Sequence, residues 1–284
     1  MKRVRVLLVF AISVALLSVC GPVWAQKSYD DHEMKDRFYI TIGGFNRTDL
    51  RTTLRLDAKS PEAGLGLGAV IGLESLFGVE SSVSTVRLDG WYRFGKKHRI
   101  AWTYWESSRD GTSTYEGDDL LIGDDIVISD GDSIAVTDDS SLLAVNWTYS
   151  FLNTAKYEGW LGIGLNFSTV DTTIDVNVGD IVGREEAQAK GTVPVPTINL
   201  GGRWNFSKKV RMLVFMQMFG LKYGDFEGKL NNTRILAEWD IIRNFGIGGG
   251  FERFAFEVDA EGENFNGSLD TSYTAFTLYL KGQI

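Results

Sequence analysis

The stretch TVRLDGWYRFGKKHRIAWTYWES, residues 85–107, combines charged and aromatic side chains in a way that few folds accommodate. Its residues alternate with a period of two, as in β-strands, where neighbouring side chains point to opposite faces. One face carries apolar residues such as Val86, while the other carries Arg87, Asp89 and Arg93. Two environments produce this pattern: a half-solvated antiparallel sheet, or a barrel wall with lipid outside and water or ion pairs inside.

The same alternation recurs along the chain, and its spacing favours one of the two environments. Ten segments carry it: 37–45, 83–95, 99–109, 142–151, 157–168, 197–206, 210–221, 234–242, 245–258 and 274–284. The connections are alternately tight, at 95–99, 152–156, 207–209 and 242–244, and mostly long and polar, at 57–82, 110–141, 169–192, 222–232 and 259–268. A soluble sandwich has no reason to sort its loops in this way, whereas outer-membrane barrels do. The sequence therefore predicts an all-β fold, an antiparallel transmembrane β-barrel of about ten strands with short periplasmic turns and long extracellular loops; eight or twelve strands are the alternatives.

The N-terminal residues have the features of a secretory signal. Basic residues in the first five positions precede an apolar run at 6–19, and Val23 and Ala25 occupy the positions that a signal peptidase reads. The apolar run is too short for a spanning helix. We therefore expect a signal peptide at 1–25, a periplasmic lead at 26–36 and a barrel at 37–284.

Composition excludes several classes of function. Removal of the signal takes away the only cysteine, Cys20, and with it any disulfide or thiol chemistry. It also removes three basic residues, so the formal charge changes from −8 to −11. A chain this acidic lacks the basic footprint that nucleic-acid binding requires, and we expect no such partner.

On these features the chain resembles the bacterial outer-membrane β-barrel proteins, in the broad class of small outer-membrane protein A- and W-type barrels and small porins. The resemblance rests on the alternating strands, the RLDGWYRF…HRIAWTYW hairpin and the terminal strand TAFTLYLKGQI. Chains of that class usually end in an aromatic residue, whereas this one ends in Ile284. The resemblance implies insertion in the outer membrane, with its lipids, lipopolysaccharide and the barrel-assembly machinery as partners. It leaves the oligomeric state open.

The predicted inward face is rich in ionisable residues. We expect a lumen charge network made of Arg47, Arg51, Arg87, Asp89, Arg93, Arg203, Arg211, Glu238, Asp240 and Lys281. Paired ions of this kind either fill the interior of a small barrel and close it, or line a narrow aqueous path. A shift of the apolar parity near Phe251–Glu252 predicts a β-bulge there.

Catalytic chemistry has little support in the sequence. The two histidines are predicted in the polar lead, His32, and in a periplasmic turn, His98, so neither is placed for a serine–histidine or aspartate–histidine device. The acidic stretch 115–139 includes Asp130 and Asp132, alternate oxygen ligands that suit Ca²⁺, and it also reads as a hairpin around Gly131.

Residues 60–82 break the two-residue rhythm. They predict either a glycine-rich loop or a short helix folded into the barrel mouth, and the glycines favour the loop. The sequence as a whole predicts a non-enzymatic integral outer-membrane barrel, either a narrow solute pore or an envelope-structural protein. A surface-binding protein that acts through its acidic loops is the alternative, and a lipid-modifying barrel enzyme is the third candidate.

Overall fold

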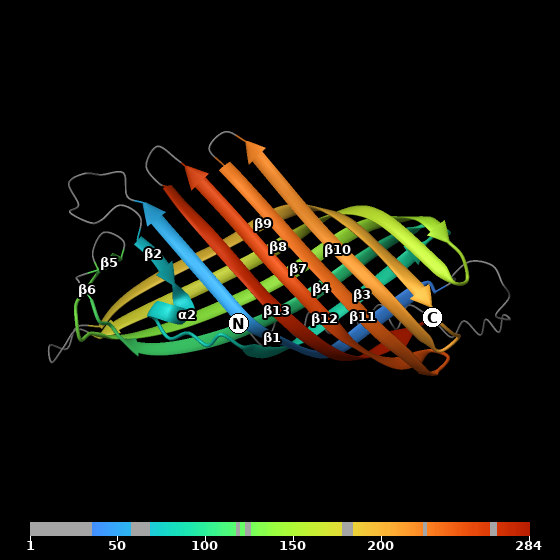
Figure 1. The fold of residues 1–284 in the computed structure, drawn as a ribbon, viewed down its shortest axis with the longest axis horizontal. Coiled ribbons are helices and arrows are strands. Elements are labelled where there is room, and N and C mark those ends of the chain that lie inside the picture. Colours follow the sequence, from blue (N-terminus) through green and yellow to red (C-terminus); the bar gives the residue numbers. More distant parts are fainter. Residues whose placement is uncertain are drawn as a thin grey trace. The chain divides into compact units, whose positions relative to one another are not determined.

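The computed structural model describes residues 36–57, 69–117, 120–122, 126–177, 184–223, 226–261 and 266–284. Within them, ten antiparallel strands form one sheet that closes on itself, because the last strand pairs with the first (Figure 1). The predicted fold class and strand number are confirmed. The expected signal peptide, His32 and nearly all of the expected lead lie outside the described residues.

The barrel strands follow the chain order around the wall. They are β1 Phe38–Asp57, β3 Val83–Phe94, β4 His98–Thr114, β7 Ser133–Asn153, β8 Tyr157–Asn177, β9 Arg184–Asn205, β10 Val210–Tyr223, β11 Phe226–Ile242, β12 Phe245–Glu261 and β13 Asn266–Gln283. Closure pairs β1 with β13 from Tyr39↔Gln283 to Asp57↔Asn266. At the end of this seam, the backbone N–H groups of Arg37 and Phe38 donate to the carbonyl oxygen of Ile284. In the half that carries the tight turns, closure leaves no edge strand, so the backbone groups of that part of the wall are paired. Toward the other end, the pairing of β9 with β10 stops at Ile198↔Met218.

The outer face is apolar over the half of the barrel that carries the tight turns. Exposed side chains such as Leu278, at 72% exposure, alternate with buried polar ones. Aromatic residues gather on this face near the tight turns: Tyr92, Phe94, Trp147, Tyr149, Phe151, Tyr157, Trp204, Phe206, Trp239 and Phe245. An apolar belt bordered by aromatic side chains is the surface that a lipid bilayer requires. Among the described helices, none combines the length and hydropathy that a membrane span requires.

Several strands run much further than the sequence predicted. The strands β7, β8 and β9 have 21, 21 and 22 residues, so parts of the expected loops 110–141 and 169–192 are strand. At about 3.3 Å per residue such a strand is roughly 70 Å long, and tilted by about 40° it rises some 50 Å, about twice an apolar belt of ~25 Å. The polar residues of these segments were expected to be loops because they lack an apolar face. They form strands because the long neighbouring strands pair with them above the membrane.

Two irregularities decide which residues face inward. Asp49 lies in the left-handed region, with φ 52°, where the pairing of β1 with β13 shifts between Thr48 and Arg51. This bulge reverses the parity of β1, so Arg51 is exposed and its expected place in the lumen is wrong. The bulge predicted near Phe251–Glu252 is also absent, because β12 pairs with β13 there without a shift.

The segment after β1 folds back into the mouth of the barrel. After a stretch outside the described residues, β2 Ala69–Gly72 pairs with the upper part of β1, and the one-turn helix α2 Leu73–Leu76 follows it. A Cβ on the inward position Gly111 of β4 would collide with the backbone of Val79, so the chain after α2 crosses the inner wall there. The favoured loop is therefore wrong in part, since a strand, a helical turn and an inward crossing occupy residues 69–80.

The acidic stretch contains a hairpin, but this hairpin precedes the one predicted around Gly131. The strands β5 Leu120–Ile122 and β6 Ile126–Ile128 pair with each other as a separate two-stranded sheet. They lie at the same end of the barrel as β2 and α2, on the left in Figure 1. Residues 130–131 form the turn that leads into β7.

Candidate functional site: the charged lumen

The end of the lumen near the tight turns contains a cluster centred on Glu158. The side chain of Glu158 is fully buried, and its carboxylate pairs with Arg93 at 2.8 Å and Arg203 at 3.0 Å. The Ser150 hydroxyl donates to the same carboxylate at 2.7 Å, and Arg99 lies 3.6 Å from it. We call these residues, together with Asp36, the Glu158 cluster. Buried charges persist only when they are paired and hydrogen-bonded in this way.

Asp36 belongs to this cluster although it lies before the first barrel strand. It precedes β1, and its carboxylate accepts hydrogen bonds from Arg203 at 2.9 and 3.1 Å and from the indole N–H of Trp91 at 3.2 Å. Burial alone would raise the pKa of Asp36, but the charges and hydrogen bonds of Arg203 outweigh it, and Arg93 and Arg99 add to them. The pKa of this carboxyl is therefore held well below its usual range.

A second cluster, centred on Glu238, lies on β10, β11 and β13. The carboxylate of Glu238 pairs with Lys281 at 3.0 Å and with Arg211 at 3.1 Å. Asp240 pairs with the same two cations, and its contact with Arg211 is 2.7 Å long. The hydroxyl groups of Tyr39 and Tyr279 also donate to Glu238. The side chains of Lys281 and Glu238 are both 0% exposed, so this pair is fully buried.

A cavity of about 70 Å³ lies deeper in the lumen. Its lining includes the buried aromatic residues Tyr39 and Trp91, whose rings stack with centroids 3.6 Å apart. Amide side chains line another part of it, and Gln217 donates to Asn199 at 2.8 Å and to Asn146 at 3.3 Å.

A third ionic cluster includes Asp89 from the cavity wall. Asp89 accepts from Arg234 at 2.8 Å and from the Thr103 hydroxyl at 2.6 Å, and it pairs with Arg87 at 3.0 Å. Arg87 also pairs with Glu252. The cluster is therefore balanced, with two arginines and two carboxylates.

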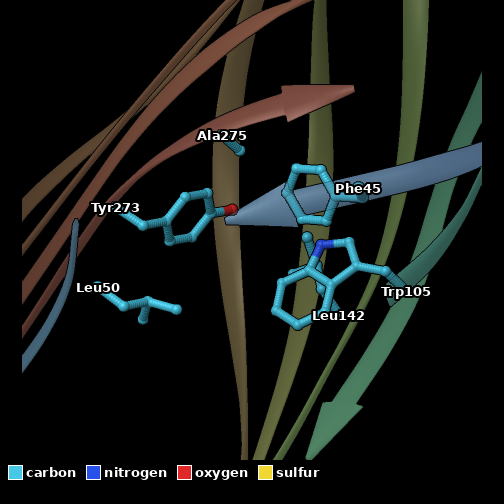
Figure 2. Close-up of a cluster of buried hydrophobic side chains, with 6 residues drawn as sticks. All are labelled: Phe45, Leu50, Trp105, Leu142, Tyr273 and Ala275. Atoms are coloured by element: carbon cyan, nitrogen blue, oxygen red, sulfur yellow. The ribbon is translucent and has the colours of Figure 1, made fainter. Parts of the chain in front are cut away.

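An apolar layer also lies in the lumen, on the side formed by β13, β1, β4 and β7 (Figure 2). Its side chains come from β1, β4, β7 and β13 and point toward one another: Phe45, Leu50, Trp105, Leu142, Tyr273 and Ala275. The guanidinium of Arg47 lies over the Trp105 ring, 4.3 Å from its centroid, and donates to Ser107.

The half of the lumen away from the tight turns contains a fourth cluster, which includes the inward-folded segment. Arg109 pairs with Glu74 of α2 at 2.7 Å and with Asp138 at 2.6 Å. The second oxygen of Glu74 accepts from the backbone N–H of Thr52 at 2.7 Å. Leu73, Phe77 and Val79 are buried beside these contacts.

The structure places nine of the ten predicted lumen residues inside the barrel. They are Arg47, Arg87, Asp89, Arg93, Arg203, Arg211, Glu238, Asp240 and Lys281, and Arg51 is the exception. Sequence reasoning missed Arg99 and Glu158 because they border tight turns, although their parity is that of the inward face. It missed Glu252 because of the predicted bulge, and Glu74 because its segment has no strand periodicity.

The predicted Ca²⁺ ligands lie in the turn before β7. Asp130 is exposed and accepts from the backbone N–H of Gly117 at 3.3 Å, while the buried Asp132 accepts from that of Ser129 at 2.8 Å. In the described residues no group of three or more potential metal ligands is found. The two carboxylates support a turn, and Ca²⁺ binding stays a prediction.

Comparison with known proteins adds information about the fold. No protein-family model and no curated protein matches the sequence. Among solved structures, the outer-membrane protease OmpT from Escherichia coli matches with a TM-score of 0.53 over 88% of this chain and 99% of that chain, at 12% identity. OprG from Pseudomonas aeruginosa matches with a TM-score of 0.35, covering 89% and 97% at 12% identity. Ail of Yersinia pestis matches with 0.24, covering 86% and 99% at 9% identity. The fold is that of the bacterial outer-membrane β-barrels.

Proposed function

We propose that this chain is an integral outer-membrane protein whose barrel is closed, so that it serves the envelope as a structural element rather than as a pore. The observation that carries the proposal is the pairing of the lumen charges with one another between strands. Glu158 joins arginines of β3 and β9, and Glu238 joins cations of β10 and β13. A conducting path needs charges that face water, whereas these face each other.

The proposed location follows from the outer surface and the expected N-terminal signal. The belt of exposed apolar side chains suits lipid, and the strands that rise above it suit the extracellular side. We propose that the chain is exported, cleaved after Ala25 and inserted by the barrel-assembly machinery, with outer-membrane lipids and lipopolysaccharide as its surroundings.

The function that we propose is not enzymatic. His98, the histidine among the described residues, begins β4 at the tight-turn rim and packs against the rings of Phe94, Trp147 and Tyr149. It lies in a ring stack on the outer face and not beside a carboxylate or a nucleophile at the extracellular rim. This placement supports no histidine-dependent hydrolysis of a peptide or lipid.

Liposome swelling tests the closed barrel. Mature protein refolded into vesicles is mixed with glycerol, a pentose or a disaccharide, and the rate of swelling is compared with that of empty vesicles. We expect no increase for any solute. Swelling that falls off with solute size would identify a small-solute pore and refute the proposal.

The long strands favour a second candidate, a surface-binding protein. The walls formed by β7, β8 and β9 rise above the apolar belt, and their outer face carries Asp139 and Asp171 directly opposite each other. This candidate is tested by titrating Ca²⁺ into the refolded barrel. A rise of the melting temperature that Asp130→Asn and Asp132→Asn remove would support it, and an unchanged melting temperature would exclude Ca²⁺ as its ligand.

A further inference from the structure

The wall of the barrel opens between β9 and β10. Their pairing stops at Ile198↔Met218. Both strands continue beyond that point, since β9 begins at Arg184 and β10 runs to Tyr223. The described pairing therefore leaves a gap between the two strands on the side away from the tight turns.

Two prolines of β9 explain where this pairing stops. The strand β8 pairs with β9 without a break across Pro194 and Pro196. In an antiparallel ladder the N–H groups of every second residue point to the same neighbour, and a proline that lacked its N–H on the β8 side would interrupt the pairing there. The missing N–H groups of both prolines therefore face β10, and they remove the donors that would continue the pairing of β9 with β10.

An apolar groove on the outer face leads to this gap. Its volume is about 950 Å³, at the upper end of the range of ligand sites, roughly 300–1,000 Å³. Its lining includes the exposed apolar side chains of Trp147, Ile163 and Leu165, on β7 and β8. Thr197 of β9 and Phe219 of β10 also line it, although their places in the strands alternate with the outward ones. The groove therefore extends into the gap.

The groove lies in the part of the apolar belt that is farthest from the tight turns. Met218, which lines it, lies eight residues after the start of β10 at Val210. At about 3.3 Å per residue and a tilt of about 40°, Met218 is roughly 20 Å from the tight-turn end, within a belt of ~25 Å. Because the tight turns are on the periplasmic side, the lipid chains beside the groove are those of the outer leaflet.

Two lysines lie at the end of the groove away from the tight turns. Lys229 is directly opposite Gly220, which lines the groove, and Lys222 follows on the same face of β10. The side chains of Lys229 and Lys222 are 61% and 76% exposed, and they pair with Glu227 at 2.9 and 3.0 Å. Exposed pairs of this kind contribute little, so the two amines can bind a phosphate group at small cost. On its other side Lys229 faces Glu257 of β12, which favours a phosphate on the side of the groove.

We propose that this groove is a binding site for lipopolysaccharide, which forms the outer leaflet of the outer membrane. One acyl chain of its lipid A part lies in the groove and enters the gap between β9 and β10, and Lys222 and Lys229 bind a phosphate group of the same molecule. The apolar lining and the amines beside it match the two parts of this lipid. A zwitterionic phospholipid offers the chain without the net negative headgroup. The inference rests on the outer-membrane location that we propose for the chain.

Native mass spectrometry tests the site. The mature protein is refolded in detergent, its folding is verified by the heat-dependent shift on gels, and it is mixed with equal amounts of lipid A and phosphatidylethanolamine. We expect one lipid A molecule per barrel to stay bound at collision energies that remove phosphatidylethanolamine. Loss of both lipids at the same energy would overturn the proposal. A mass of two barrels without lipid would also overturn it, because the groove would then be a contact between copies of the chain.

Two glycine variants place the lipid on the barrel. Gly220→Leu fills the groove without a clash, because a Cβ at Gly220 meets nothing within 4 Å. Gly44→Leu is the matched control, since Gly44 is also exposed with open space for a Cβ but lies on β1, outside the groove. Lipid A should bind Gly220→Leu roughly tenfold more weakly, which corresponds to the loss of about two buried CH₂ groups, and should bind Gly44→Leu as it binds the wild type. Equal binding by the two variants would refute the assignment to the groove.

Lipid A without its phosphate groups tests the role of the lysines. The wild type should bind this form more weakly than intact lipid A, whereas the double variant Lys222→Gln, Lys229→Gln should bind both forms alike. A preference for intact lipid A that persists in the double variant would contradict the headgroup contact. Lipid binding does not depend on conduction, so this site and the closed barrel can fail separately.

Discussion

The substitution Glu158→Gln tests how much the charge pairing stabilises the barrel. It keeps the shape of the side chain and removes its charge, so three arginines are left with Asp36 alone. At contacts of 2.8 and 3.0 Å, each pair attracts with about 6 kcal/mol at an effective dielectric constant near 20, and desolvation offsets most of this. Breaking a buried pair by removing one partner costs about 3–5 kcal/mol net.

The assay is unfolding of the refolded barrel by guanidinium chloride in lipid vesicles. The matched control is Glu227→Gln, which removes a carboxylate from an exposed pair with Lys222 and Lys229. Exposed pairs contribute little, so we expect no measurable change in the control. A loss for Glu158→Gln no larger than that of the control would refute the view that the lumen charges hold the barrel together.

Three further predictions follow from the described contacts. Gly43→Ala should impair folding, because its Cβ would collide with the carbonyl oxygen of Leu278 and with Tyr279 across the closing seam. A Cβ at Gly44 meets nothing within 4 Å, so Gly44→Ala should fold normally. The folded fractions of the two variants are compared on unheated gels, and equal yields would contradict the described pairing of β1 with β13. Phe45→Ala should lower the free energy of unfolding by about 3–5 kcal/mol in the same vesicle assay, because it empties the centre of the apolar layer, and a loss below 1 kcal/mol would mean that the layer is not packed. The lowered pKa of Asp36 predicts that the barrel is sensitive to acid. The contribution of Asp36 to the free energy of unfolding is complete above the ordinary aspartate pKa of about 3.9, and it is lost as the pH falls toward the pKa of Asp36 in the folded state. The wild type should therefore lose more stability than Asp36→Asn between pH 6 and pH 3, and parallel losses would argue against the pairing with Arg203.

The wall of the barrel was predictable from the sequence because lipid outside and ions inside force a strict two-residue period. Strands such as β3 and β4 carry that period over their whole membrane-facing length. The extracellular parts of β7, β8 and β9 were missed. A strand segment whose outer side faces water needs no apolar face, and it is held in the sheet by backbone pairing with its neighbours.

The lumen was predictable where a charge lay in the middle of a regular strand. Arg87, Glu238 and Lys281 were placed correctly for that reason. Arg51 was misplaced because one residue, Asp49, adopts a left-handed conformation and reverses the parity of everything after it. A single bulge leaves little trace in the residue pattern, yet it exchanges the two faces of a strand.

Which charged residues pair with each other inside a cluster could not be predicted from the sequence. Glu158 on β8 meets arginines on β3 and β9, and Glu74 reaches Arg109 by way of a folded-back segment. Parity assigns a residue to a face, but it does not give the height of that residue relative to distant strands. The three-dimensional closure of the sheet sets those heights.

Single-channel recording in a planar bilayer tests the closed lumen most directly. Purified mature protein is inserted at 1 M potassium chloride, and insertion is verified by the heat-dependent shift of the recovered barrel on gels. A closed lumen predicts no discrete conductance steps in membranes that contain folded protein. Steps of constant size, altered by charge reversal at Arg203 but not at the exposed Arg51, would show that the inward charges line an open pore and would contradict the account.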